Sequence, residues 1–458
     1  MERIKDLFRS PKVAYDPLDE TADHEGDALM QGDGDDGLLN SQIQDEREVV
    51  VTPFSWVDYV VFMLLGVAML WAWNMFLAAG PYFQSRFQGN EWLLANFQSA
   101  ELTVSTVANL VSMIVLANMQ ANASYPRRII IGLLINIGIF TLLALSTLAF
   151  LGVSQLRYFW FLMCVILVSS TATGLLQNGI FAFMAGYGRE EYAQGNMTGQ
   201  AIAGVLPCIV QIISVLSVPK VNSTEEAVHE ASKSATVYFL TASGISIITL
   251  LAFSLLLIRD RSRLSNSALL NASTEDTARP PKKRVSLALL YRKTFFLSTS
   301  VFITFAIAMF FPVFTQRIQS VHSPDNIPRI LEPTSFIPLA FLIWNSGDLI
   351  GRVISAVPSL RITHRPHLVL TLALARILLI PLYYLCNTDG KGAVISSDWF
   401  YFLVQITYGV TNGFMGTMCM MGAVEYVDVA EREATGAFMT LMLVGGLTAG
   451  SILSFLLA

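Results

Sequence analysis

Charged side chains are scarce in this sequence. They make up 14% of the 458 residues, whereas an average soluble domain carries roughly 25%. Hydrophobic residues make up 53%, and the mean hydropathy is +0.55. This composition excludes the soluble enzymes and predicts a protein that crosses a membrane several times. The net charge of −5 decides little, because most of the acidic residues lie in residues 1–50.

Several chemical motifs are missing as well. The sequence has no G-x-x-x-x-G-K-[ST] motif, which argues against transport powered by ATP. Its five histidines fall in the tail or in loops, which disfavours a membrane enzyme with a His or metal-ligand cluster. No large soluble domain supports a receptor or scaffold, and no rings of polar residues support a channel. We therefore expect no enzyme activity, no cofactor, no metal and no nucleic-acid partner.

The four cysteines give no sign of a disulfide framework. Cys164, Cys208, Cys386 and Cys419 all lie inside apolar segments, without the spacing of a metal site. Such cysteines behave as small hydrophobic residues. The chain also begins without the apolar stretch of a signal peptide, so we expect none.

Long apolar segments dominate the rest of the chain, and eleven of them can each cross a bilayer as a helix. We expect an all-α membrane protein with a six-helix bundle over 51–258 and a five-helix bundle over 295–458, joined by a basic loop over 259–294. The expected spans cover about 56–80, 94–119, 129–152, 158–186, 195–218, 236–258, 295–318, 335–357, 367–386, 398–421 and 433–457.

The first fifty residues are polar, acidic and nearly free of aromatic side chains. Such a composition cannot form a core, so we expect a disordered tail over 1–50. Tyr15 and Leu18 form a Tyr-x-x-bulky pattern, and residues 25–30 resemble an acidic dileucine signal. Both patterns are typical of sorting signals but also arise often by chance. They suggest sorting adaptors as partners.

The distribution of positive charge predicts the orientation in the membrane. With a cytosolic N-terminus, most of the 29 Lys and Arg residues fall on the cytosolic side, including those of the basic loop. The positive-inside rule therefore favours this arrangement, with the C-terminus lumenal or extracellular. The glycosylation sequon that starts at Asn222 then lies on the outer side.

One span differs from the others by carrying an acidic and a basic residue close together. Asn345, Asp348 and Arg352 lie at positions i, i+3 and i+7 of the segment 336–358, so they share one helical face. Asp348 and Arg352 are four residues apart and can pair. Ionisable residues at membrane depth are costly and by default mark a substrate or ion path, although a structural ion pair between packed helices is the alternative.

Polar residues in other spans add candidate ligand contacts. Trp71, Trp73 and Asn74 lie within the first span rather than at its ends, where a Trp beside an Asn suits a flat heteroaromatic ligand. Gln177 offers an amide in a glycine-rich fourth span. Helix packing is the alternative explanation for these residues.

Further charges lie within or near the spans. Arg376 lies within the ninth span, where it could serve packing or function equally well, and Glu101 lies near the outer end of the second. Arg128 at the start of the third span could pair with Glu431 or Glu433 at the start of the eleventh. Such a pair would close a gate in one state and open it in another.

Six segments resemble the equilibrative nucleoside transporters, and the resemblance covers nearly every span from 56 to 458. The first twenty residues are similar to the fungal, vacuole-resident branch of that family. The matching segments are WAWNMF at 71–76, the glycine-rich stretch at 174–186, WNSGDLIGR at 344–352, ARILLIPLYYLCN at 375–387, TYGVTNGFMGTMCM at 407–420 and EATGAFMTLMLVGGL at 433–447.

This resemblance implies a 6+5 fold related to the major facilitator architecture, with one central cavity and nucleoside transport by alternating access. Nucleobases are additional candidate substrates. A proton-coupled nucleoside transporter and a sugar or drug carrier of the same architecture remain the alternatives. By position, the resemblance implies base contacts at Trp73 and Gln177 and ribose contacts at Asp348 and Arg352, with cavity walls at Leu70, Asn345 and Leu447.

The resemblance also implies two gates. The outer gate would contain Leu77, Phe311 and Pro312, and the inner gate would contain Asn74, Arg128 and Glu433.

The resemblance and the tail motifs together favour a vacuolar or lysosome-like membrane, with the plasma membrane as the alternative. The implied partners are purine and pyrimidine nucleosides and the surrounding lipid.

Overall fold

The computed structural model describes residues 54–120, 123–150, 152–217, 224–270, 285–322 and 328–455. Four sequence predictions fall outside these ranges: the disordered tail over 1–50, the sorting pattern at Tyr15 and Leu18, the dileucine-like pattern and the sequon at Asn222. The central part of the basic loop, 271–284, lies outside them as well.

The described residues of the first half of the chain form seven helices. Short polar caps begin several of them: the side chain of Ser55 accepts a hydrogen bond from the backbone N–H of Asp58, and Asn90 caps the next long helix in the same way. The helices are α3 (Trp56–Ala78), α4 (Gly80–Phe87), α5 (Glu91–Asn118), α6 (Tyr125–Ala149), α7 (Gln155–Ala185), α8 (Glu190–Ser217) and α9 (Thr224–Leu270).

The second half contains shorter and more interrupted helices. Prolines cause part of this, because Pro312 and Pro381 each lack an N–H and end the helix that precedes them. The elements are α10 (Leu287–Ala308), α11 (Phe311–Arg317), η2 (Arg329–Leu331), α12 (Pro333–Ile354), η3 (Pro358–Leu360), α13 (Pro366–Ala375), η4 (Arg376–Leu379), α14 (Ile380–Tyr383), α15 (Asp398–Gly422), η5 (Ala423–Tyr426), η6 (Val429–Glu431) and α16 (Arg432–Phe455).

Within the described residues, ten helical stretches are long and apolar enough to cross a membrane. The remaining predicted span, 398–421, coincides with α15, a helix of 25 residues. Buried polar side chains such as Gln405 and Asn412 lower its hydropathy. The predicted all-helical membrane fold is therefore confirmed. The basic loop is shorter than expected, because α9 continues to Leu270 and α10 already begins at Leu287.

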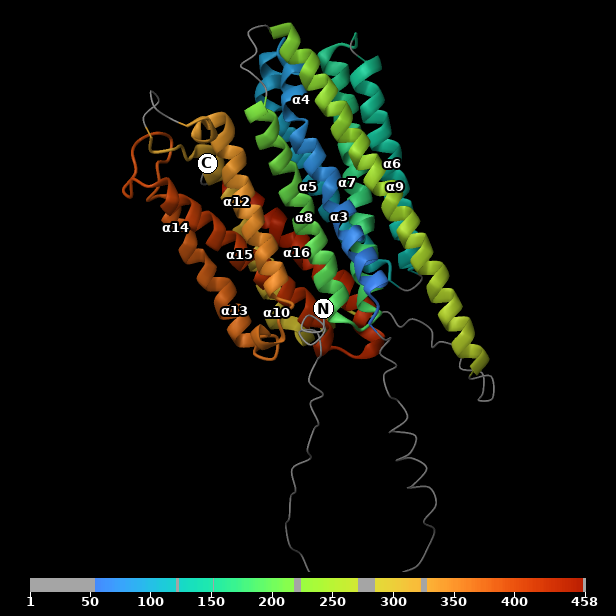
Figure 1. Cartoon of the computed structure of the whole chain (residues 1–458). Helices are drawn as coiled ribbons and strands as arrows, with labels where there is room; N and C mark the ends of the chain where they lie inside the picture. Colours follow the sequence, from blue (N-terminus) through green and yellow to red (C-terminus); the bar gives the residue numbers. More distant parts are fainter. Residues whose placement is uncertain are drawn as a thin grey trace, which may run out of the picture.

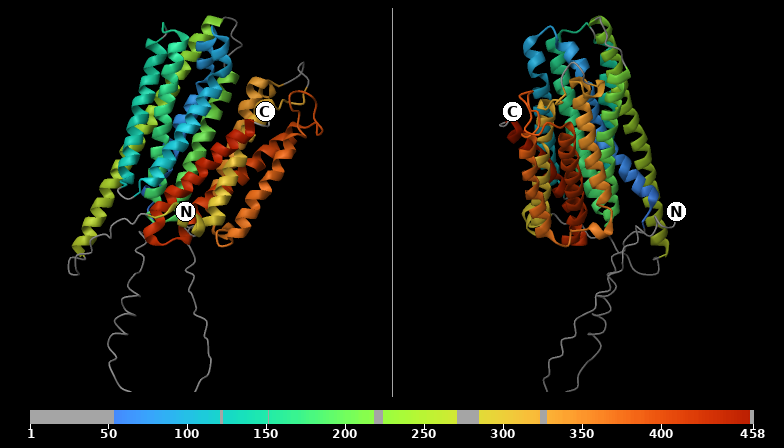
Figure 2. Two further views of the ribbon diagram at one scale, coloured as in Figure 1. Left: turned by 180° about the vertical axis from the view of Figure 1, so that it is seen from behind. Right: turned by 60° about the vertical axis from the view of Figure 1, so that its left-hand side comes forward.

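The helices form two groups that follow the order of the chain. Helices α3 to α9 lie together on one side of the molecule and α10 to α16 on the other, as the views in Figures 1 and 2 agree. The groups meet where α12 packs on α8 and α16 packs on α7 and α5. We call the end of the bundle with Trp56, Glu190 and Arg361 the proximal end, and the end with Ala78 and Gln155 the distal end.

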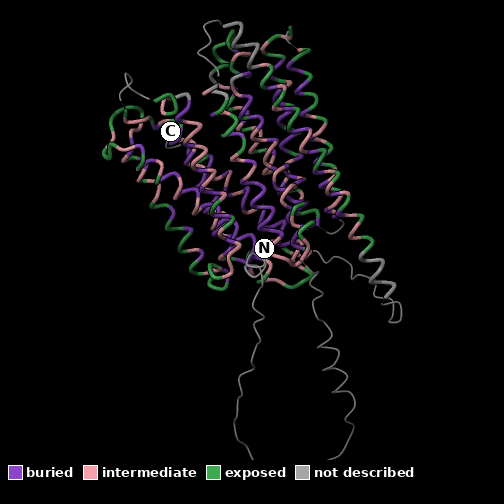
Figure 3. Tube along the Cα trace, viewed as in Figure 1, coloured by how far each residue is buried: buried purple, intermediate pink, exposed green. Residues whose placement is uncertain are grey.

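Buried residues lie mainly in the interior of the bundle, and exposed residues lie mainly on its outer faces and at its ends (Figure 3). The largest apolar core contains Phe181, Met184 and Met197 from the first group together with Met420 and Phe438 from the second, so it crosses the boundary between the groups. Exposed leucines cover the outer faces of α9 and α13, as a lipid-facing surface requires. The functional site must therefore be sought at the boundary between the groups.

Candidate functional site

An ion pair between Asp348 and Arg352 lies at this boundary. Both residues are on α12, and Arg352 Nε donates to Asp348 Oδ2 over 2.7 Å. Asp348 is 3% exposed and Arg352 is 5% exposed. Asn345, one turn earlier on the same face, donates to the carbonyl of Phe341 over 2.9 Å. The three residues predicted to share a face do line one cavity.

The sequence did not reveal the other partners of this pair. Asn412 of α15 donates from Nδ2 to Asp348 Oδ1 over 2.7 Å, and Arg352 Nη1 donates to the carbonyl of Met197 on α8 over 2.7 Å. Helix α15 reaches α12 this closely because residue 413 is glycine, whose Cβ would lie 1.9 Å from the carbonyl oxygen of Asp348. Only the close approach of these helices makes Asn412 part of the site.

The ion pair borders a cavity of about 320 Å³ between the two helix groups. Cavities of this volume suit small organic ligands. Its walls come from α3, α5, α7 and α8 on one side and from α10, α11, α12, α15 and α16 on the other. They include Leu70, Trp73, Asn74, Ser105, Asn109, Ser169, Thr173, Gln177, Phe311, Trp344, Asn345, Asp348, Arg352, Asn412, Val444 and Leu447.

The wall that α7 contributes to the cavity is polar. Ser169, Thr173 and Gln177 lie four residues apart on α7 and therefore form one stripe. Gln177 Oε1 and Asn109 Oδ1 are buried there without a hydrogen-bond partner. A ligand that donates hydrogen bonds would satisfy these acceptors. The spacing of four could have identified this stripe from the sequence, but only Gln177 was predicted.

Five of the predicted binding residues outside the charged pair also line the cavity: Leu70, Trp73, Gln177, Asn345 and Leu447. Trp73 lies on α3, which runs as one uninterrupted helix. Its neighbour Trp71 points elsewhere, because its Nε1 donates to Thr241 on α9 over 3.3 Å. The two tryptophans therefore occupy different environments although they are only two residues apart.

Of the three residues predicted for the outer gate, Phe311 lines the cavity and the other two do not. Phe311 lines the cavity and stacks flat on Trp344, with ring centroids 3.9 Å apart and an angle of 2° between the planes. Leu77 is 54% exposed at the distal end of α3. Neither Leu77 nor Pro312 belongs to the cavity wall.

One implied grouping needs correction. Asn74 was expected beside Arg128 and Glu433 at the inner gate, but it lines the cavity and donates to the carbonyl of Ala203 over 2.7 Å. It lies one turn from the distal end of α3, whereas Glu433 is in the first turn of α16 at the proximal end. These levels differ by roughly 25 Å along the helix axes at 1.5 Å per residue.

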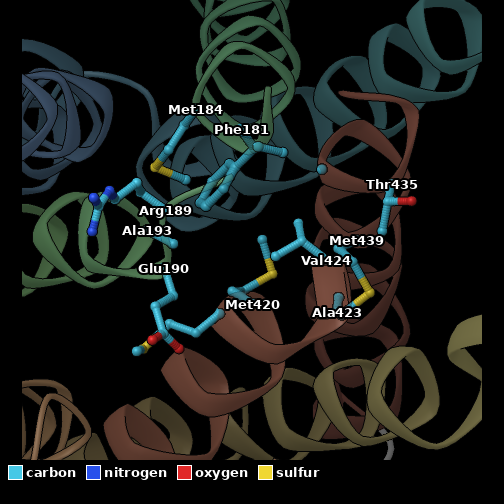
Figure 4. Close-up of a pocket in the computed structure, with 13 residues that line it drawn as sticks. Phe181, Met184, Arg189, Glu190, Ala193, Met420, Ala423, Val424, Thr435 and Met439 are labelled. Carbon is cyan, nitrogen blue, oxygen red and sulfur yellow. The ribbon is translucent and has the colours of Figure 1, made fainter. Parts of the chain in front are cut away.

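Toward the proximal end, the two helix groups meet around a small pocket whose apolar lining side chains we call the apolar plug (Figure 4). Phe181 and Met184 of α7 face Met420 of α15 and Met439 of α16, and the space left between them is only about 20 Å³. An ion pair between Arg361 and Glu190 joins the two helix groups at the proximal end. Apart from Arg352, which lies in the last turn of α12, the residues that line the cavity lie in the middle and distal parts of their helices, and we therefore describe the proximal side as closed.

The charged residues of the predicted inner gate lie around this plug. Arg128 donates to Asn178 and to the carbonyl of Met119, and Glu433 lies against Gly186. Glu431 does not pair with Arg128 here, because it binds Lys293 over 2.6 Å.

Chemically, the cavity has the groups needed to bind a small polar molecule. It combines an aromatic face, amide acceptors and a carboxylate–guanidinium pair that can bind hydroxyl groups. Within the described ranges, no group of three or more His, Cys, Asp or Glu side chains could hold a metal ion.

This chain is similar to known nucleoside transporters. The model of the nucleoside transporter family matches residues 162–458. The nucleoside transporter FUN26 of Saccharomyces cerevisiae is 30% identical, over 87% of this chain and 83% of that protein. Equilibrative nucleoside transporter 1 of Homo sapiens is 24% identical, over 87% of this chain and 96% of that protein.

Solved structures show the same fold. The fucose:proton symporter FucP of E. coli has a TM-score of 0.57 and 13% identity, covering 88% of this chain and 92% of that chain. The proton:xylose symporter XylE has a TM-score of 0.57 and 11% identity, covering 86% of each chain. At such low identity these two likenesses concern architecture alone. On the family match and the yeast relative, this chain belongs to the nucleoside transporter family.

Proposed function

We propose that this protein carries nucleosides across a membrane by facilitated diffusion, with a cavity that opens alternately to each side. The observation that carries the proposal is that the buried Asp348–Arg352 pair lines the same cavity of about 320 Å³ as aromatic and amide side chains. A nucleoside has a π-face, polar base edges and a diol, so it matches all three features.

Within this cavity we assign the binding roles by chemistry. Trp73 stacks on the base and Gln177 accepts a hydrogen bond from its edge. Asp348 and Arg352 bind the ribose hydroxyls, since a carboxylate accepts and a guanidinium donates. Leu70, Asn345 and Leu447 complete the walls.

Alternating access in this scheme is a relative motion of the two halves, residues 51–258 and 295–458. Leu77, Phe311 and Pro312 form the distal gate, and Arg128 and Glu433 act with the apolar plug at the proximal end. The distribution of Lys and Arg supports a cytosolic proximal end. In that orientation the structure corresponds to a form closed on the cytosolic side.

We place the protein in a vacuolar or lysosome-like membrane, with sorting adaptors that read Tyr15 and Leu18. The support is the acidic tail with its two sorting-like patterns. Alanine at both positions should move a fluorescently tagged protein to the plasma membrane. Unchanged vacuolar location would remove this motif from the proposal.

The decisive test is uptake into proteoliposomes that contain the purified full-length protein. We expect saturable uptake of radiolabelled uridine and adenosine but not of glucose. Uptake should be the same with and without a protonophore, because the two charges that line the cavity, Asp348 and Arg352, are already paired with each other. Glucose uptake would point to a sugar carrier, and loss of uptake with the protonophore would point to proton coupling.

The paired tryptophans provide a matched test of the base contact. Trp73→Ala should weaken adenosine binding by about tenfold or more, because stacking of a base on an aromatic ring contributes about 1–3 kcal/mol. Trp71→Ala removes the same side chain outside the cavity and should leave the dissociation constant unchanged. Equal losses in the two variants, measured by equilibrium binding, would contradict the stacking role.

A further inference from the structure

Arg376 is a buried cation behind the cavity. It begins the 3-10 turn η4, is 3% exposed and does not belong to the cavity wall. A guanidinium at membrane depth is costly unless acceptors surround it. The question is therefore which acceptors hold it there and what their arrangement achieves.

Three acceptors on two other helices hold this guanidinium. Nη1 donates to the carbonyl of Thr304 on α10 over 2.9 Å, Nε donates to Thr411 Oγ1 over 3.2 Å, and Nη2 donates to Asn412 Oδ1 over 3.2 Å. The charge also lies over the ring of Tyr408, 5.3 Å from its centroid. The planar guanidinium of an arginine can donate to several acceptors on different helices at once, which suits this position better than the single ammonium group of a lysine.

The contact with Asn412 determines the orientation of an amide. A guanidinium can only donate, and an ionised carboxylate can only accept. Asn412 lies between Arg376 and Asp348, so its Oδ1 must face Arg376 and its Nδ2 must face Asp348. Without Arg376, the Oδ1 of Asn412 would lose its donor, so the amide would be held only by its bond to Asp348 and would no longer fix the position of that carboxylate.

We propose that Arg376 is a positioning residue for substrate binding. Through Asn412 it holds the carboxylate of Asp348 in the orientation that receives the ribose hydroxyls. This inference rests on the proposed function, because it takes the ribose contact of Asp348 as its starting point. It extends the site by one layer of residues behind the cavity wall.

This role makes a selective prediction. Loss of Arg376 should weaken binding through the ribose hydroxyls and leave binding through the base intact. A purely structural role would weaken every ligand equally. The ratio of the dissociation constants of uridine and 2′,3′-dideoxyuridine separates the two roles, because the second ligand keeps the base but lacks both hydroxyls.

The experiment measures both constants by equilibrium binding to the purified full-length protein. We expect Arg376→Gln to weaken uridine binding by about tenfold, since one hydrogen bond to a charged group is lost, and to change dideoxyuridine binding by less than about twofold. Arg86→Gln is the matched control. Arg86 also donates to backbone carbonyls, those of Phe150 and Val153, but lies in the other half, so both constants should stay unchanged.

A double variant tests whether Arg376 affects ribose binding through Asp348. Asp348→Asn should shift the same ratio, and adding Arg376→Gln to it should shift the ratio little further, because both changes act on one contact. Additive shifts, or equal losses for both ligands, would overturn the positioning role. If Arg376→Gln does not fold, Asn412→Leu takes its place with the same expected ratio and the same overturning result.

The failure of the two proposals can be told apart. If Asp348→Asn leaves the ratio unchanged, the ribose contact is wrong and the inference falls with it. If Asp348→Asn shifts the ratio and Arg376→Gln does not, the proposed function stands and the positioning role alone is wrong.

Discussion

Replacing Asp348 by alanine should nearly abolish uridine uptake. Two effects combine in this variant. The ribose loses a charged acceptor, which reduces affinity by about 100-fold if both hydroxyls bind the carboxylate. Arg352 also loses its only carboxylate partner in the structure described and Asn412 loses one of its hydrogen bonds, and a buried charge without its counter-ion costs about 3–5 kcal/mol of folding stability. Uptake into proteoliposomes and thermal unfolding in detergent measure the two effects.

A double variant separates transport from stability. Asp348→Leu combined with Arg352→Met replaces the ion pair by apolar residues of similar size. Such replacements are often neutral or stabilising by about 1–4 kcal/mol. We therefore expect the unfolding temperature to recover while uridine uptake stays absent. Recovery of both would mean that the pair is only structural, and the substrate site would have to be sought elsewhere in the cavity.

Replacing Gly436 by valine should open the proximal end of the molecule. Helix α16 touches α7 at this residue, and a Cβ here would lie 2.2 Å from the carbonyl oxygen of Phe181. The overlap occurs only in the form in which the two helices are in contact. Overpacking costs about 1–3 kcal/mol, so the ratio of proximally open to closed molecules should rise by about tenfold or more.

Labelling of an introduced cysteine measures this shift. Met439→Cys places a thiol in the apolar plug, where it reacts with a maleimide only when the plug opens. Cys164, the exposed native cysteine, is replaced by serine first, whereas Cys208, Cys386 and Cys419 are buried. We expect Gly436→Val to raise the labelling rate by about tenfold, and uridine should lower it again if it favours the closed form.

Gly445→Val on the same helix is the control. Its added Cβ would lie 3.5 Å from the Phe302 ring, an ordinary contact, so the labelling rate should not change. If both variants raise the rate equally, the effect is a general loosening of α16. If neither does, the contact between α7 and α16 is not what closes the proximal end.

The amino-acid sequence determined the helical membrane fold and part of the site. A bilayer provides no partner for backbone groups, so each apolar run must form its own helix, and this requirement can be recognised locally. For the same reason the helical face with Asn345, Asp348 and Arg352 was predictable, because the positions of residues on one helix follow from their spacing. Trp73 and Gln177 were found as polar or aromatic residues within apolar runs.

Only the tertiary structure decided which helices meet at the site. Asn412 lies 64 residues from Asp348 and Met197 lies 155 residues from Arg352, and nothing in their own segments distinguishes them from packing residues. Only the structure shows that Asn74 lies far from Arg128 and Glu433 and that Glu431 pairs with Lys293. Spacing along a helix fixes what one face presents, but contacts between helices depend on how closely the backbones approach, which glycines such as Gly413 and Gly436 permit only in the packed molecule.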